Sequence, residues 1–155
     1  MLRVPGVLFI TGFVLMTQAT AVSAQDSSYE TRALRIEGHH GDTRIVRGAD
    51  GNVVGTIGIF RGINVEELVS ESDKATLEAK QFAHDYGPGT IFLSLGIATL
   101  GASIGVSQIN DVNRSITTGL TLAGTGLIVY GAGRLQNAYN ALARSIWWYN
   151  RDLKR

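Results

Sequence analysis

The sequence predicts an α+β membrane protein: a small β-meander plus helix forming an outer domain, then a two-helix glycine-rich transmembrane hairpin and an amphipathic C-terminal helix. Two apolar stretches, Thr90 to Ile109 and Ile116 to Gly133, flank a short polar loop and contain no proline. Alternating β-rich runs end near Phe60, and apolar residues at helical spacing follow from Ala75 to Tyr86. We therefore expect four parts, residues 1–24, 25–87, 88–133 and 134–155.

Residues 1–24 have the pattern of a secretory signal peptide. Arg3 precedes an apolar run from Val4 to Met16, which is short for a bilayer span, and small residues lead to Ala24. We expect cleavage before Gln25, and an uncleaved signal anchor is the alternative. The chain has no cysteine, so the exported domain must be stabilised by burial instead of disulfides.

Three β-rich runs follow a polar segment from Gln25 to Glu30 that we expect to be disordered. Ala33 to Glu37 alternates with period two, and Thr43 to Arg47 is joined to Asn52 to Phe60 through Gly48-Ala49-Asp50-Gly51. An Asp-Gly pair between such runs is a strong hairpin signal, because glycine accepts a positive φ. We expect a three-stranded meander. Two glycines in the third run suggest a bulge or a close backbone approach, Gly55 and Gly58.

A helix is predicted after the meander. Ser70-Glu71-Ser72-Asp73 offers capping hydroxyls and acids for the first turn. The apolar residues that recur at helical spacing are Ala75, Ala79, Phe82, Ala83 and Tyr86. This narrow, alanine-rich face predicts close packing on the sheet. Gly87-Pro88-Gly89 predicts the end of the helix and the boundary with the membrane, because proline lacks a donor and glycine permits a turn.

The two apolar stretches predict the transmembrane hairpin. The first is about the 20 residues that a bilayer span requires. In lipid, helices associate through close backbone approach over small residues. The small residues expected to pack the two helices together are Ser94, Ala98, Gly101, Ala102, Gly105, Gly119, Ala123, Gly126 and Gly133. The alternative is a helix pair buried in a soluble assembly, but a domain this short could not cover both helices.

The C-terminal segment, residues 134–155, is amphipathic, and Gly131-Ala132-Gly133 before it predicts a hinge. Its aromatic and basic residues predict a helix lying at the membrane–water interface, where indole and phenol rings partition and arginine reaches phosphates. The residues expected at this interface are Arg144, Trp147, Trp148, Tyr149 and Arg151. The alternative is a docking helix whose aromatic residues pack on the outer domain or on a partner.

Charge is divided along the chain. From Asp26 to Tyr86, seven basic residues stand against eleven acids, and from Arg134 onward five basic residues stand against Asp152 alone. The near-neutral total argues against a nucleic-acid partner. A signal peptide and two spans would place the basic tail outside with the acidic domain, against the positive-inside tendency. We favour this topology, and a re-entrant segment with a cytoplasmic tail is the alternative.

Catalytic chemistry has little support in the sequence. His39, His40, Asp42, His84 and Asp85 could ligate zinc, but nothing in the sequence directs them to one point, and exposed loop histidines are the better interpretation. We expect no enzyme, cofactor or resident metal. The sequence favours an accessory subunit of a membrane complex in the cell envelope, in contact with lipid and with itself or another membrane protein. The alternative is an extracytoplasmic ligand or metal sensor using the His39 and His40 loop.

Overall fold

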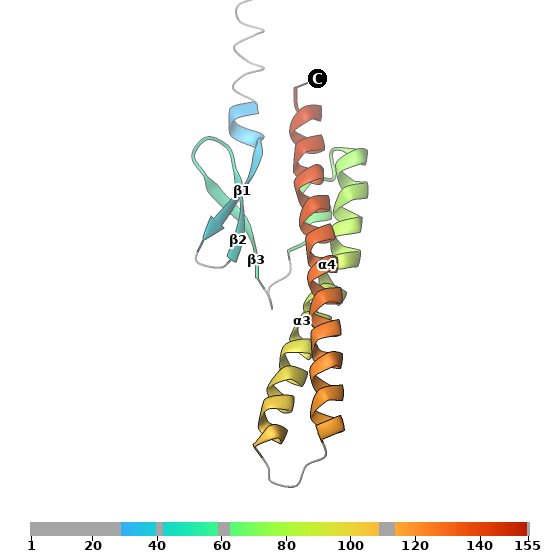
Figure 1. The fold of residues 1–155 in the computed structure, drawn as a ribbon. Helices are drawn as coiled ribbons and strands as arrows, with labels where there is room; N and C mark the ends of the chain where they lie inside the picture. Colours follow the sequence, from blue (N-terminus) through green and yellow to red (C-terminus); the bar gives the residue numbers. More distant parts are fainter. Residues whose placement is uncertain (1–28, 40–41, 59–62, 109–113, 155) are drawn as a thin grey trace, which may run out of the picture.

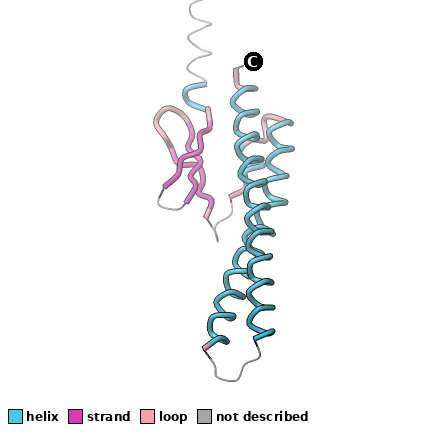
Figure 2. The backbone as a smooth tube through the Cα atoms, in the orientation of Figure 1, coloured by secondary structure: helices cyan, strands magenta, loops and turns pink. Residues whose placement is uncertain are grey.

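The computed structural model describes residues 29–39, 42–58, 63–108 and 114–154, and it has an α+β architecture (Figures 1 and 2). Residues 29–32 form one helical turn. The labelled elements are β1 (Leu34–His39), β2 (Asp42–Arg47), β3 (Asn52–Ile57), α2 (Val65–Leu68), α3 (Asp73–Ser107) and α4 (Arg114–Asp152). The predicted signal peptide and residues 25–28 lie outside the described residues.

The three-stranded meander is confirmed. The strands are antiparallel in the order β1-β2-β3, with Ile36 opposite Ile45 in the first pair. The turn between β2 and β3 contains Gly48 at φ 74° and Gly51 at φ 68°. These are left-handed backbone conformations that favour glycine, which is why the Gly-Ala-Asp-Gly sequence marks this turn.

The third strand contains the irregularity that its glycines suggested. Ile45 pairs with Gly55 and Val46 pairs with Val53, so β3 has one more residue than β2 at this point. A Cβ atom built on Gly55 would overlap the side chain of Ile63. The bulge and the close approach therefore occur together, and Gly55 leaves the space that the Ile63 side chain occupies.

Helix α3 begins where the sequence predicts and ends much later. The hydroxyl of Ser72 accepts a hydrogen bond from the Ala75 amide at 3.3 Å, which caps the helix. The predicted stop at Gly87-Pro88-Gly89 is wrong, because Pro88 lies inside one helix of 35 residues. Two interactions favour continuation: Gly89 packs against Leu135 of α4, and the Thr90 hydroxyl donates to the carbonyls of Tyr86 and Gly87. Neighbouring helices and threonine hydroxyls commonly support a proline inside an apolar helix.

Helix α4 is also continuous, so the predicted hinge at Gly131-Ala132-Gly133 and the separate C-terminal helix are corrected. One helix of 39 residues extends through both regions. Gly131 is held against the backbone of α3, since a Cβ atom there would lie 2.5 Å from the Leu93 nitrogen. Helix packing thus overrides the low helix propensity of glycine.

The hydrophobic core lies where the sheet meets one end of the helix pair, and Figure 1 shows β1 beside the last turns of α4. It is formed by Leu34, Ile45, Ile57, Val65, Val69, Ala75, Ala79, Phe82, Ala138, Ala141, Leu142, Ile146 and Tyr149. The side-chain amide of Asn150 bonds both the amide and the carbonyl of Leu34, each at 2.8 Å. The C-terminal segment is therefore an integral part of the sheet-bearing domain.

Candidate functional site

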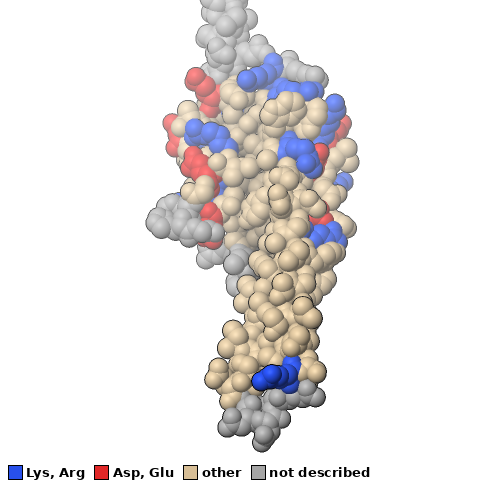
Figure 3. Space-filling model, in the orientation of Figure 1, with Lys and Arg blue, Asp and Glu red and all other residues tan. Residues whose placement is uncertain are grey.

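The halves of α3 and α4 remote from the sheet form an uncharged rod. Among the described residues from Tyr86 to Gly133, Arg114 alone carries a charge. Figure 3 shows acidic and basic side chains gathered at the sheet-bearing end and almost none on the rest of this face. Both helices are long and apolar enough to cross a membrane, and only 17% and 11% of their apolar windows are buried. The core helix of a soluble protein would be mostly buried. An exposed apolar surface of this size is typical of a site that contacts a membrane or another protein.

A seven-residue ladder of small residues joins the two helices. The buried rungs on α3 include Gly89, Gly96 and Ser103, and those on α4 include Gly124 and Gly131. A Cβ atom added at Gly96 would lie 2.8 Å from the Gly124 carbonyl oxygen, and one added at Gly131 would lie 2.9 Å from the Gly89 carbonyl oxygen. A strict seven-residue repeat keeps one seam facing the partner helix, and glycine lets the two backbones approach closely.

Near the end of the rod remote from the sheet, hydroxyl groups form hydrogen bonds between the two helices. The Ser103 side chain lies 2.7 Å from the Thr121 hydroxyl and donates to the Thr117 carbonyl at 3.2 Å. Thr121 also donates to Thr117 at 2.9 Å. Polar groups in an apolar medium need such partners, so this cluster fixes the register of α3 against α4.

The small residues chosen from the sequence do not form this seam. All nine face away from the partner helix and are exposed: Ser94, Ala98, Gly101, Ala102, Gly105, Gly119, Ala123, Gly126 and Gly133. Cβ atoms built on the five glycines among them would meet nothing within 4 Å. Each helix thus has two glycine-bearing faces. The inner face holds α3 to α4, and each helix carries an open glycine face on the side away from its partner.

A buried ion pair marks the boundary between the rod and the sheet-bearing end. The side chain of Asp85 is 4% exposed and pairs with Arg134 of α4. Gln81 donates to its other oxygen at 2.6 Å, and His84 lies 3.2 Å away. The bond from Gln81 is the largest influence on the pKa of Asp85, which lies below its ordinary value of 3.8, since the lowering contacts outweigh desolvation. Arg134 and His84 lower this pKa further.

Aromatic side chains lie at the same boundary. The Tyr130 hydroxyl accepts a hydrogen bond from Arg134 Nε at 3.2 Å, and its ring meets Phe92 edge-on at a centroid distance of 4.9 Å. Tyr130 is also 50% exposed. A phenol with its ring toward an apolar surface and its hydroxyl toward a charge is typical of a membrane–water interface. The sequence prediction missed this pair because it placed the interface in the C-terminal segment.

The residues that the sequence predicts at the membrane interface lie further along α4. Trp147 is roughly 20 Å beyond Arg134 along α4, at 1.5 Å per residue. It is 56% exposed and meets Trp148, while Tyr149 is 3% exposed and belongs to the core. The Arg151 guanidinium lies 4.0 Å from the centre of the Trp148 ring. Arg144 pairs with Glu78 at 2.9 Å. Trp148 and Tyr149 thus follow the docking alternative, in which aromatic residues of this helix pack on the outer domain.

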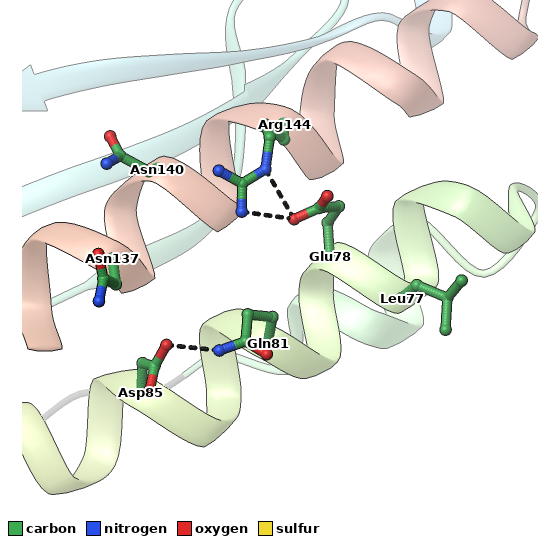
Figure 4. A pocket seen from close by; sticks show the side chains of 7 residues that line it. All are labelled: Leu77, Glu78, Gln81, Asp85, Asn137, Asn140 and Arg144. Atoms are coloured by element: carbon green, nitrogen blue, oxygen red, sulfur yellow. Dashed lines mark hydrogen bonds and ion pairs between the residues drawn. The ribbon is translucent and has the colours of Figure 1, made fainter.

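A polar groove lies between α3 and α4, next to the ion pair (Figure 4). Its volume is about 450 Å³. Helix α3 supplies Leu77, Glu78, Gln81 and Asp85, and α4 supplies Asn137, Asn140 and Arg144. One wall therefore carries the carboxylates and the other carries the guanidinium and two amides. Nothing in the sequence pattern paired these residues, because they lie about 60 positions apart.

The histidine cluster has no structural support among the described residues. His39 is in β1 and His84 is in α3, where its Nδ1 faces Asp85. His40 lies outside the described part of the chain. No group of three or more metal-ligating side chains occurs within residues 29–39, 42–58, 63–108 and 114–154.

Comparison with known proteins gives no relative: no family model, curated protein or solved structure matches the chain.

Proposed function

We propose that the protein is a non-enzymatic, membrane-anchored component of the cell envelope and serves as a structural or accessory subunit of a membrane complex. The uncharged rod is the observation that carries this proposal. Its α3 portion, residues 86–107, is roughly 33 Å long at 1.5 Å per residue, close to the ~30 Å hydrocarbon core of a bilayer. The large apolar side chains exposed on the rod include Ile91, Leu95 and Ile104 of α3 and Leu122 and Val129 of α4.

In this proposal the helix pair forms a transmembrane hairpin, with the Asp85–Arg134 pair at one membrane surface and Arg114 at the other. The sheet and the C-terminal end of α4 are joined through Asn150, so they occupy the same side. A signal peptide at residues 1–24 would make that side extracytoplasmic. This arrangement supports the topology in which the basic tail stays outside, because burial of Tyr149 retains it there.

The open glycine face is the surface we assign to assembly. On α4 this face contains Gly119, Gly126 and Gly133, which recur every seven residues. Gly101 and Gly105 of α3 form a second open face on the opposite side of the helix pair. In lipid, an exposed small-residue face lets another helix approach closely. The partner is a second copy of the chain or another membrane protein, and the exposed Trp147 offers a separate contact above the bilayer.

Cysteine accessibility tests the anchoring and the topology. The parent chain contains no cysteine, so single substitutions Asp50→Cys, Ala143→Cys and Gln108→Cys give specific probes at exposed positions. In intact cells, a membrane-impermeant thiol reagent should label positions 50 and 143 and should reach position 108 only after lysis. Labelling of all three in intact cells, or release of the protein by alkaline carbonate, would contradict a double-spanning anchor.

A further inference from the structure

We propose that the groove between α3 and α4 binds the headgroup of a zwitterionic phospholipid with a primary ammonium, the phosphoethanolamine class. The inference rests on the proposed membrane insertion and adds a ligand to the same helix pair. It follows from the place of the groove, from the division of charge between its walls, and from polar groups there that the fold leaves open.

The groove is at headgroup depth. It begins at Asp85, which with Arg134 ends the uncharged rod. Gln81 and Asn137 lie about one helical turn further out, and a turn rises about 5.4 Å. The polar headgroup layer adds about 5 to 8 Å on each side of the hydrocarbon core. A phospholipid beside the rod would therefore present its phosphate at the level of Gln81 and Asn137. Glu78 lies roughly 4.5 Å further out at 1.5 Å per residue, on the side toward which the amine extends.

The walls of the groove carry opposite chemistry. Glu78 on α3 offers one open carboxylate oxygen, while Arg144, Asn137 and Asn140 on α4 offer N–H donors (Figure 4). Both oxygens of Asp85 already have protein partners, Gln81 and Arg134. An ammonium facing α3 and a phosphate facing α4 would each meet complementary groups. The charges of Glu78 and Asp85 are balanced by those of Arg144 and Arg134. The groove is therefore neutral overall and favours a zwitterion over a lipid of net charge.

Several groups in the groove remain available to a ligand. Glu78 uses Oε2 for Arg144, and within the described part of the chain its Oε1 accepts no hydrogen bond. The amides of Asn137 and Asn140 likewise have no protein partner there, and both residues are exposed. A primary ammonium can donate a hydrogen bond to Oε1 of Glu78, whereas a quaternary choline cannot. This difference predicts discrimination between two headgroups of the same net charge.

Native mass spectrometry of the full chain in detergent tests the proposal. Dioleoylphosphatidylethanolamine should bind about tenfold or more tightly than dioleoylphosphatidylcholine, the effect of losing one charge-assisted hydrogen bond. Asn140→Leu would fill the groove and should abolish the preference, and Glu78→Gln should reduce it. Gln136→Leu, at an exposed position outside the groove lining, is the matched control and should bind like the parent.

The outcomes separate this inference from the proposed function. Equal binding of the two lipids by the parent chain, or a preference unchanged in Asn140→Leu, would overturn the headgroup site even if carbonate treatment leaves the protein in the membrane. Soluble O-phosphoethanolamine provides a second probe that needs no bilayer. Chemical-shift changes at the Asn137 and Asn140 side-chain amides on its addition would support the site, and their absence at millimolar concentration would count against it.

Discussion

At the scale of single residues, an offset of two positions decides which glycines hold the helices together. Gly131 is buried against Leu93, while Gly133 is exposed with open space around it. Two residues correspond to about 200° around a helix, so the two lie on nearly opposite faces. Because α4 has glycines on both faces, small-residue spacing predicted close packing but not the side on which it occurs. A seven-residue repeat could not decide between the two faces of α4, because the exposed Gly119, Gly126 and Gly133 have the same spacing as the buried Gly124 and Gly131.

The first prediction compares these two glycines. Gly131→Ala should destabilise the helix pair by about 1–3 kcal/mol, because the new methyl group would overlap the backbone of α3. Gly133→Ala has free space and should stabilise it by about 0.5–1 kcal/mol through higher helix propensity. Denaturant unfolding in a fixed detergent measures both. Equal effects of the two substitutions would show that the seam does not pass through position 131.

The second prediction concerns pH and Asp85. The folded-state pKa of this carboxyl lies below 3.8, mainly because of Gln81, with Arg134 and His84 acting in the same direction. Its contribution to stability is therefore complete above pH 3.8 and declines as the pH falls below that value toward the folded-state pKa. Asp85→Asn should remove this part of the acid dependence. An unchanged slope of unfolding free energy with pH in the variant would contradict the assignment.

At the scale of elements, local sequence predicted starts and turns better than ends. The Ser72 cap and the positive-φ glycines at positions 48 and 51 depend on a few adjacent residues, and both were found. Pro88 and Gly131 signal a break locally, yet helix contacts with residues about 40 positions away outweigh these signals. For the same reason the polar groove could not be predicted, since its walls come together only when the ladder sets their register.

The third prediction tests how the sheet is attached to the helix pair. Asn150→Ala removes two hydrogen bonds to the Leu34 backbone and should cost about 1–3 kcal/mol, because a partly buried amide and carbonyl lose their partner. Hydrogen exchange of the Leu34 amide should speed up relative to the Ile36 amide. Gln136→Ala, at an exposed position on the same helix, should leave both rates unchanged.

At the scale of the whole molecule, acidic and basic segments far apart in sequence meet in one domain. Arg134 pairs with Asp85, and Arg144 pairs with Glu78. The acidic and basic segments therefore lie on the two sides of the contact between α3 and α4. Their pairing offers a reason for the basic tail to stay on the same side as the acidic domain, against the positive-inside tendency. Exposed pairs of this kind are worth about 0–1 kcal/mol each, so the buried Asp85 pair and the apolar core dominate.

The fourth prediction separates assembly from folding. Gly126→Leu places a bulky side chain on the open face and should reduce cross-linked dimers or higher complexes in membranes while leaving unfolding of the single chain unchanged. Gly124→Leu, two positions away, faces Leu100 at 2.9 Å and should disrupt the chain itself. If Gly126→Leu leaves the yield of cross-linked species at the parent level, the open glycine face is not an assembly surface.

The uninterrupted course of α3 and α4 has a mechanical consequence. With no break between the rod and the sheet-bearing end, a rod that spans a bilayer, as we propose, would tilt together with the sheet-bearing end as one rigid body. Trp147 stands roughly 35 Å from the middle of the rod at 1.5 Å per residue. A tilt of about 20°, ordinary for membrane helices, would sweep it sideways by roughly 12 Å. In a membrane-inserted protein, a change in bilayer thickness that alters the tilt would thereby displace Trp147 sideways without any conformational change in the helices.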